Sequence, residues 1–261
     1  MSDENGHKSQ VIGQFTQQAE SYARLTGSMA GGEGQAVFSV LVQARPGDVV
    51  LDVCCGPGTM ALDMAPYVAH VTGLDLTPAM LDQARAAQAK RGVDNVAWRE
   101  GDVYALPFAD GAFSLVMSTA AFHHMTNPRA AFAELVRVCR PGGRIALRDV
   151  TPEADKSAAY DRMEILRDPS HTHALTRAEM AALGEGLPVG APALHASVAA
   201  DLPLEAILAA SFPEACSIAE LRAMFHEDAR SGEDRLGFKA RLIGEEIRVS
   251  YRQTTAIWVK Q

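Results

Sequence analysis

Leu51-Asp-Val-Cys-Cys-Gly-Pro-Gly-Thr59 is the stretch that decides the fold of this chain. Residues 48–54, which overlap the start of this stretch, form a short apolar run without polar alternation, which is typical of a strand buried on both faces. The following residues, Thr59–Tyr67, have the composition of a helix. Glycine lets a ligand approach the backbone closely, and the N-terminus of a helix offers free N–H groups. The stretch therefore predicts a strand, a ligand-binding loop and a helix.

The alternation of strands and helices continues outward from this loop. Further strands are predicted at His70–Asp75, Val96–Glu100, Phe113–Ser118 and Gly143–Arg148. Helices are predicted between them at Pro78–Arg91 and Arg129–Cys139. Strands that alternate with helices indicate an α/β protein, with a parallel sheet covered by helices on both faces.

The segments before and after this core have a different sequence pattern. Before the core, helices are predicted at Gln14–Arg24 and Glu33–Arg45, with a break at Gly31–Gly32. After it, helices are predicted at 155–167, 176–185, 203–210 and 218–225, with a loop at 183–194 and two closing strands near 247–251 and 254–259. We therefore divide the chain into an N-terminal helical lid segment (1–45), a binding core (46–150), a helical insert (151–210) and a closing helix with C-terminal strands of the core sheet (211–261).

Composition excludes several classes of protein. The chain has 261 residues, of which 48% are hydrophobic and 21% charged, so one large domain or a domain with a lid is expected. Its net charge of −8, from 24 basic and 32 acidic residues, argues against a nucleic-acid partner. No apolar stretch approaches the ~20 residues of a spanning helix, and the first ten residues lack an apolar signal core.

The four cysteines, Cys54, Cys55, Cys139 and Cys216, form neither a disulfide framework nor a CxxC metal pair. They are expected to be small core residues in a reducing, cytoplasmic setting. We expect a small-molecule substrate and no membrane partner, and we retain a homodimer as one possible assembly.

Two ligands suit the loop. Gly56-x-Gly58-x-x-Ala61, followed by Asp75 at the end of the next strand, fits the dinucleotide pattern of NAD-binding proteins. The alternative is S-adenosylmethionine, which has a ribose and an adenine but no phosphate. Asp52 would repel a pyrophosphate, and it could organise the loop or meet a cationic amino group. Pro57 removes a backbone donor that a phosphate would need. Asp102, after the third strand, could accept a hydrogen bond from an adenine amino group. These features favour S-adenosylmethionine.

Four motifs in order strengthen this interpretation. They are residues 51–59, Gly73–Leu76 with Pro78–Leu81, Gly101–Phe108 and Arg140–Gly143. As a set they resemble class I S-adenosylmethionine-dependent methyltransferases, close to the small-molecule group that includes ubiquinone- and menaquinone-type enzymes. Residues 164–171 also resemble a short subfamily motif of methyltransferases whose substrates are undefined. The resemblance implies a Rossmann-like, doubly wound sheet of seven strands, mostly parallel with an antiparallel last strand, plus a helical lid insert.

The resemblance also implies roles for matched positions. Gly56 and Gly58 would face the methionine moiety, with Ser118 and Thr119 nearby; Asp75 would hold the ribose hydroxyls, and Asp102 the adenine edge. The full set of expected cofactor-binding residues is Tyr22, Asp52, Cys54, Gly56, Gly58, Asp75, Leu76, Met80, Gly101, Asp102, Val103, Ser118 and Thr119. Simpler interpretations stand beside these: Asp75 as a solvated strand-end carboxylate, Asp102 as a turn cap and Tyr22 as plain packing. The Cys54-Cys55 pair departs from the family pattern and affects the expected loop shape.

Two histidines, His123 and His124, follow the fourth strand at the edge where α/β sheets bind ligands. One of them could take a proton from a hydroxyl, an amine or an acidic carbon, and the other reading is a structural hydrogen bond. Arg167 could clamp an anionic substrate or pair with Asp168. His171 is a further substrate-binding candidate. A His171/His173 metal pair lacks a third ligand, so no metal is expected.

The function that these features predict is in-line methyl transfer from S-adenosylmethionine to O, N or C of a small metabolite, with the acceptor chosen by a largely apolar insert. Two alternatives remain open: an NAD(P)-dependent oxidoreductase on the same architecture, and a protein that binds the cofactor without transferring its methyl group. Protein or RNA methylation is disfavoured by the acidic balance and by the absence of a basic-aromatic stripe.

Overall fold

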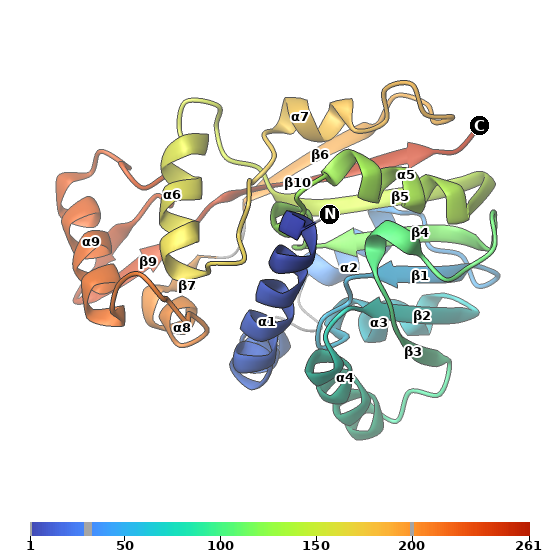
Figure 1. Ribbon diagram of the computed structural model, residues 1–261, viewed down its shortest axis with the longest axis horizontal. Coiled ribbons are helices and arrows are strands. Elements are labelled where there is room, and N and C mark those ends of the chain that lie inside the picture. The colour runs from blue at the N-terminus through green and yellow to red at the C-terminus, as the bar shows by residue number, and fades with distance from the viewer. Residues whose placement is uncertain (1, 29–32, 199–200) are drawn as a thin grey trace.

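A seven-stranded sheet forms the centre of the computed structural model, which describes residues 2–28, 33–198 and 201–261 (Figure 1). Its strand order is β3-β2-β1-β4-β5-β10-β6. The strands are β1 (Val49–Val53), β2 (His70–Asp75), β3 (Val96–Glu100), β4 (Phe113–Thr119), β5 (Cys139–Val150), β6 (Ala193–Val198) and β10 (Arg252–Val259). Strands β1 to β5 pair in parallel, whereas β10 runs antiparallel to both β5 and β6. The predicted Rossmann-like sheet with an antiparallel last strand is therefore confirmed.

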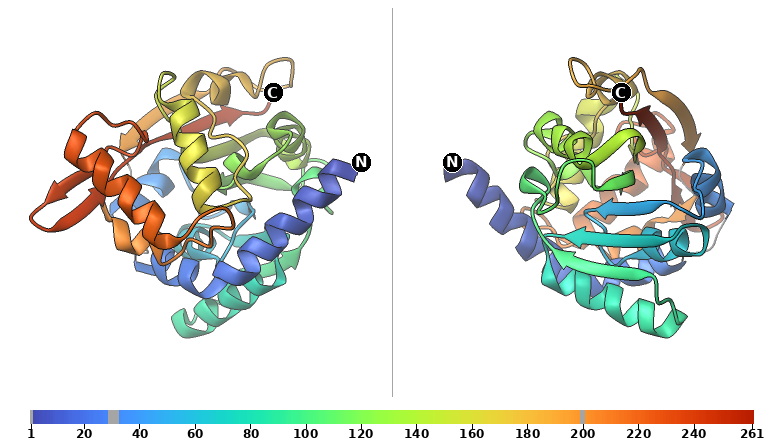
Figure 2. Two further views of the ribbon diagram at one scale, coloured as in Figure 1. Left: turned by 60° about the vertical axis from the view of Figure 1, so that its left-hand side comes forward. Right: turned by 90° about the vertical axis from the view of Figure 1, so that its right-hand side faces the viewer.

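Helices cover both faces of this sheet (Figure 2). They are α1 (Ser2–Ser28), α2 (Glu33–Leu41), α3 (Thr59–Met64), α4 (Pro78–Arg91), α5 (Pro128–Val138), α6 (Ser157–Arg167), α7 (Arg177–Ala182), α8 (Leu204–Leu208) and α9 (Ile218–Ser231). Three short 3₁₀ turns are η1 (Ala65–Tyr67), η2 (Val103–Ala105) and η3 (Phe122–His124). Side chains of α5 and α7 pack on one face around Trp258, and those of α2 and α3 pack on the other around Val50.

Local sequence signals set several element boundaries. Helix α4 begins at Pro78, whose fixed φ suits the first helical position, and Gly92 follows it in a left-handed conformation (φ 64°). Helix α5 also begins at a proline, and the side chain of Asn127 accepts a hydrogen bond from the Ala130 N–H. Strand β2, helix α4 and strand β3 have the boundaries that the sequence predicts.

Strand β6 was not expected, because the sequence predicts a loop through residue 194. Most of its side chains are exposed, so it lacks the apolar pattern of a buried strand. It is a strand because its backbone pairs with β10 from Ala193↔Ile257 to Val198↔Arg252. The first helix is also longer than predicted, and the predicted break at Gly31–Gly32 lies outside the described residues.

The two predicted closing strands belong to different sheets. Strand β10 completes the main sheet, whereas β9 (Glu246–Val249) lies between β7 (Leu202–Pro203) and β8 (Arg241–Ile243) in a second, three-stranded sheet. A separate core holds this small sheet against α6, α8 and α9, and it includes Ile247 and Val249 (Figure 1). The expected boundaries at 151–210 and 211–261 therefore do not follow the layers, since the insert supplies β6 to the core sheet. Among the described helices, none has the length and apolar composition needed to cross a membrane.

Candidate active site

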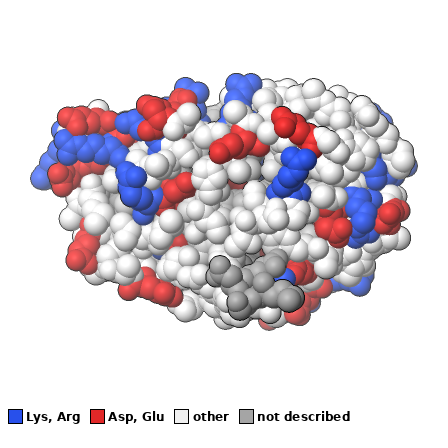
Figure 3. Space-filling view, turned by 45° about the horizontal axis from the view of Figure 1, so that its top comes forward, with Lys and Arg blue, Asp and Glu red and all other residues white. Residues whose placement is uncertain are grey.

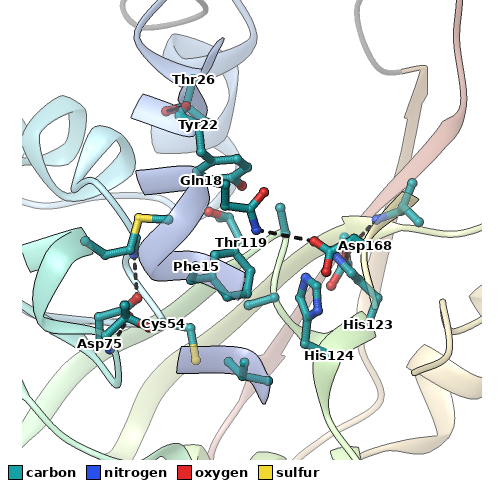
Figure 4. Close-up of a pocket in the computed structure, with 18 of the residues that line it drawn as sticks. Phe15, Gln18, Tyr22, Thr26, Cys54, Asp75, Thr119, His123, His124 and Asp168 are labelled. Carbon is teal, nitrogen blue, oxygen red and sulfur yellow. Dashed lines mark hydrogen bonds and ion pairs between the residues drawn. The ribbon is translucent and has the colours of Figure 1, made fainter. Parts of the chain in front are cut away.

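A cavity of about 280 Å³ lies where the carboxyl ends of β1, β2, β4 and β5 meet α1 and the insert. Ligands of open α/β sheets bind at this edge. Of the residues predicted from the sequence, those that line the cavity are Tyr22, Cys54, Gly56, Asp75, Leu76, Met80, Gly101, Asp102, Val103, Thr119, His123, His124 and Arg167. Figure 4 shows that the labelled members come from α1, from the strand ends and from the insert.

The loop between β1 and α3 forms one wall. Cys54 and Gly56 both have left-handed backbones, with φ of 57° and 52°. The Gly56 N–H donates to Asp75 Oδ2 at 2.8 Å. A Cβ on Gly56 would meet only Tyr22 Cε1 within 4 Å, at 3.8 Å, so the loop leaves open space on the cavity side. Burial raises the pKa of the Cys54 thiol well above its usual range, so this thiol is a neutral wall residue.

Gly58 has a different role from the one predicted. It lies outside the cavity lining, and a Cβ there would come within 2.4 Å of the Trp98 ring and 2.9 Å of Ala84. With φ at 78° it also begins α3 in a left-handed conformation. Packing beneath the loop requires glycine at this position.

Asp75 is buried, with 8% of its surface exposed, which excludes the solvated-carboxylate alternative. Its second oxygen, Oδ1, accepts the Thr77 N–H at 2.9 Å. Burial raises its pKa, and the N–H groups of Thr77 and Gly56 oppose that rise. The carboxylate therefore holds the loop and the start of α4 in place while it lines the cavity.

Asp102 caps a turn, as one of its two interpretations predicts, and it also lines the cavity. Its carboxylate accepts the Tyr104 N–H at 2.9 Å and forms an ion pair with Lys8 of α1 at 2.5 Å. The side chain of Asp102 therefore connects the core to the N-terminal helix.

Asp52 and Ser118 lie behind the cavity wall, not in it. Asp52 is 1% exposed, and neither carboxylate oxygen has a hydrogen-bond partner among the described side chains and backbone. Burial raises its pKa to about 8, with a further contribution from the negative charge of Asp75. The Ser118 hydroxyl is likewise buried without a partner in the described part of the chain. Neither residue meets the expectation of direct cofactor contact.

The buried Asp52 carboxyl makes stability depend on pH. Its folded pKa lies above its unfolded value, so unfolding releases a proton and stability falls as pH rises from about 4 to about 8. Asp52→Asn is expected to reduce the slope of the free energy of unfolding against pH by about 1 kcal/mol per pH unit. Chemical denaturation from pH 5 to 8 measures it, with the exposed Asp82→Asn as control. Parallel curves for wild type and Asp52→Asn would contradict the assignment.

His123 and His124 have separate roles. His123 Nδ1 lies 2.7 Å from Asp149 Oδ1, and Asp149 also accepts the N–H groups of Phe122 and Val150. Burial lowers the pKa of His123, but the negative charges of Asp149, Glu164 and Asp168, with the hydrogen bond to Asp149, together raise it above the usual value. The Asp149 carboxylate keeps the proton on Nδ1 and leaves Nε2 as an acceptor. No hydrogen bond joins Nε2 to another described residue.

His124 is a structural residue. Its Nδ1 lies 3.0 Å from the Ser170 carbonyl oxygen and 3.1 Å from the Ser170 hydroxyl. Burial, with the neighbouring His123, lowers its pKa to about 3, so its imidazole is neutral. The contacts of His124 match the structural alternative, whereas the Nε2 atom of His123 makes no hydrogen bond to a described residue.

Helix α1 lines the cavity and contacts both the core and the insert. Its Gln18 amide donates to Asp168 Oδ2 at 3.3 Å, and His7 Nε2 lies 2.8 Å from the His124 carbonyl oxygen. Phe15 stands edge-on to Tyr22 and to the His124 ring, at centroid distances of 6.2 and 5.0 Å (Figure 4). The helix runs alongside α4 (Figure 2).

The insert side corrects two expectations. Arg167 lines the cavity, but it pairs with Glu164 at 2.5 Å and not with Asp168. His171 lies outside the lining, since Asp161 accepts a hydrogen bond from its Nε2 at 2.8 Å. The same Asp161 binds His173 at 2.7 Å. Within 2–28, 33–198 and 201–261, no group of three His, Cys, Asp or Glu side chains is arranged to hold a metal.

Several cavity residues escaped the sequence analysis, namely Asp149, Tyr160, Glu164, Phe238 and Tyr251. Asp149 directly follows the predicted strand Gly143–Arg148, so its position at the sheet edge was a usable signal. The two tyrosines and Phe238 come from distant segments, and no local pattern joins them.

Comparisons with known proteins identify methyltransferase relatives of this chain. A family model described as a methyltransferase domain matches residues 50–143. The chain is 33% identical over 171 residues to YcgJ of Bacillus subtilis, an uncharacterized methyltransferase, covering 65% of this chain and 67% of YcgJ. It is 43% identical over 109 residues to the uncharacterized Rv1403c of Mycobacterium tuberculosis, covering 42% of this chain and 39% of that protein.

Solved structures show the same architecture. The crystal structure of YcgJ aligns with a TM-score of 0.75 at 23% identity, covering 87% of this chain and 97% of YcgJ. BH2331 of Bacillus halodurans aligns with a TM-score of 0.76 at 25% identity, covering 88% and 99%. The chain belongs to the class I S-adenosylmethionine-dependent methyltransferases.

Proposed function

We propose that this methyltransferase transfers a methyl group to a small organic metabolite within the cavity described above. One observation carries the proposal. A single cavity joins a glycine loop and two carboxylates, Asp75 and Asp102, to a His123–Asp149 pair and to an apolar insert. The part around the glycine loop and the two carboxylates, the cofactor half, suits a cofactor. The part around the His123–Asp149 pair and the insert, the acceptor half, suits an acceptor.

The residues of the cofactor half fit S-adenosylmethionine. Gly56 leaves backbone open to the cavity, and Pro57 offers no N–H for a phosphate. Asp75 and Asp102 bring two carboxylates to one ligand, which suits a positively charged sulfonium compound. We propose that Cys54 and Gly56 hold its methionine end and that Asp75 holds the ribose. Leu76, Met80, Gly101, Asp102 and Val103 would surround the adenine, and Tyr22 and Thr119 would lie towards the reacting end.

The chain's own residues supply position and proton transfer. When bound, S-adenosylmethionine supplies an electrophilic methyl group and is left as S-adenosylhomocysteine. His123 Nε2 accepts the proton that the acceptor atom loses, and Asp149 stabilises the imidazolium that results. Helix α1 and the insert exclude water from the cavity and hold the acceptor in line.

The segments divide this work. We propose that residues 1–45 act as the lid and that 46–150 bind the cofactor. Helices α6 and α8 of the 151–210 segment, with residues of 211–261 such as Phe238 and Tyr251, would form the acceptor side. A small acceptor also agrees with the surface, where acidic and basic side chains are intermixed on the face in Figure 3. A polyanion would favour a continuous basic stripe.

An organic acceptor fits better than a metalloid. An arsenite methyltransferase of Halobacterium salinarum is 38% identical over 112 residues, covering 42% of this chain and 29% of that protein. Soft ions of this kind bind thiolates. Of the cysteines among the described residues, two line the cavity, Cys54 and Cys55. Burial raises the pKa of both thiols well above the usual range.

Parallel calorimetric titration tests the cofactor assignment. The purified protein is titrated with S-adenosylmethionine, S-adenosylhomocysteine and NAD. Micromolar binding of the first two, without binding of NAD, is expected. Binding of NAD alone would overturn the proposal and support an oxidoreductase. Binding of S-adenosylmethionine without turnover on a broad metabolite library would instead favour a non-catalytic binding protein.

A further inference from the structure

Three tyrosine side chains line the cavity, Tyr160 and Tyr251 in its acceptor half and Tyr22 towards the reacting end. Tyr22 comes from α1, Tyr160 from α6, and Tyr251 from the turn between β9 and β10. No hydrogen bond joins any of the three hydroxyls to a described residue. Burial raises the pKa of each, to about 12 for Tyr251, so all three are neutral phenols that can donate or accept.

Aromatic rings form the body of this half. Tyr160 stacks on Phe238 with a centroid distance of 4.6 Å and an interplanar angle of 16°. Tyr251 stands edge-on to both rings, at 6.4 Å from Tyr160 and 6.3 Å from Phe238. Leu202, Ile207 and Ala210 complete the wall with aliphatic groups. Such a wall favours a flat, apolar ligand body.

The charged groups here are already paired. Glu164 forms two hydrogen bonds with Arg167, whose Nη1 also lies 3.4 Å from the Ser211 hydroxyl. Asp168 accepts the Ser170 N–H and hydroxyl, at 3.0 and 2.5 Å, as well as the Gln18 amide.

Asp149 is paired in the same way, since it binds His123 and two backbone N–H groups. An anionic ligand would have to break the Arg167–Glu164 pair, and a cationic ligand would compete with these donors for each carboxylate. Losing such buried partners is costly. The polar atoms of this half that make no hydrogen bond to a described residue therefore include the phenol hydroxyls of Tyr160 and Tyr251 and the Nε2 atom of His123.

We propose, resting on the methyltransferase function above, that the acceptor is an uncharged aromatic compound with a hydroxyl oxygen, a phenol or an enol. Tyr160 and Tyr251 are its specificity-determining residues, because their hydroxyls would bind the oxygen functions of the ligand. His123 lies in the same cavity to take the hydroxyl proton. Buried donors left unpaired by the wrong ligand penalise its binding.

Binding of matched probes tests the ligand class. The protein saturated with S-adenosylhomocysteine is titrated with 2-naphthol, 2-naphthoate, 2-naphthylmethylammonium and naphthalene, followed by ligand-observed NMR. We expect 2-naphthol to bind at least about tenfold more tightly than the two charged probes. Equal or tighter binding of either charged probe, or no binding by any probe, would overturn the proposal.

The double variant Tyr160→Phe/Tyr251→Phe keeps both rings and removes both hydroxyls. This variant should lower the affinity for 2-naphthol by about tenfold, because two neutral hydrogen bonds are lost, and leave the affinity for naphthalene unchanged. Tyr67→Phe, on the surface outside the cavity, is the control. Unchanged binding of 2-naphthol by the double variant would show that the hydroxyls do not select the ligand. Calorimetry with S-adenosylmethionine separates failure of this proposal from failure of the proposed function. If wild-type protein does not bind S-adenosylmethionine, the methyltransferase function itself is contradicted.

Discussion

His123→Ala is expected to lower kcat by about 100- to 10,000-fold, the range that a positioned general base contributes. The reason is the Asp149 carboxylate, which lies 2.7 Å from His123 Nδ1 and leaves Nε2 to take the acceptor proton. His124→Ala is the matched control, since His124 binds Ser170 and should affect thermal stability more than kcat. Both variants are compared on an acceptor that wild type methylates. Full turnover by His123→Ala would show that this residue is not the base.

The pH profile gives a second measurement of the same base. His123 must be neutral to act, and nearby carboxylates, of which Asp149 contributes most, raise its pKa above the usual value of about 6.5 against the lowering effect of burial. Activity should therefore fall as pH drops through a midpoint above about 6.5. Asp149→Asn should move that midpoint to lower pH. Asp161→Asn, which alters a carboxylate bound to His171 outside the cavity, should leave it unmoved.

Asp75→Ala is expected to weaken the binding of S-adenosylmethionine by about 100-fold. Hydrogen bonds to a charged group contribute about 1.5–3 kcal/mol, and the variant also removes the acceptor of the Gly56 and Thr77 N–H groups. Calorimetric titration measures the loss, and Asp82→Ala on the exposed side of α4 is the control. Asp75→Asn, which keeps one acceptor oxygen, should be intermediate.

Two outcomes bear on this assignment. Wild-type affinity in Asp75→Ala would show that Asp75 does not hold the ribose. A thermal unfolding curve taken on the same sample distinguishes loss of the ligand contact from loss of the fold, because a cooperative transition near the wild-type midpoint indicates a folded protein.

Local sequence patterns were sufficient for the core. The boundaries of β2, α4 and β3 were predicted correctly because a proline, a glycine and an unbroken apolar run act within a few residues of each other. Cys54, Gly56, Asp75 and Asp102 line one cavity for the same reason, because each lies at or after the end of a strand at the same sheet edge. Their roles toward the cofactor stay predictions. The similarity to quinone-type methyltransferases stays a prediction.

The sequence by itself predicted the alternating strands and helices of the core and the sheet edge at which the cavity lies, because these depend on periodicity and on turn residues close together in the chain. The class of protein followed from the resemblance of four ordered motifs to known methyltransferases. The tertiary structure alone decided which side chains of residues 151–261 line the cavity. Likewise, strand β6 exists because β10 pairs with it. Tyr22, Tyr160 and Tyr251 line one cavity although more than 200 residues separate the first from the last. Contacts at such separations follow from packing, which no local pattern records.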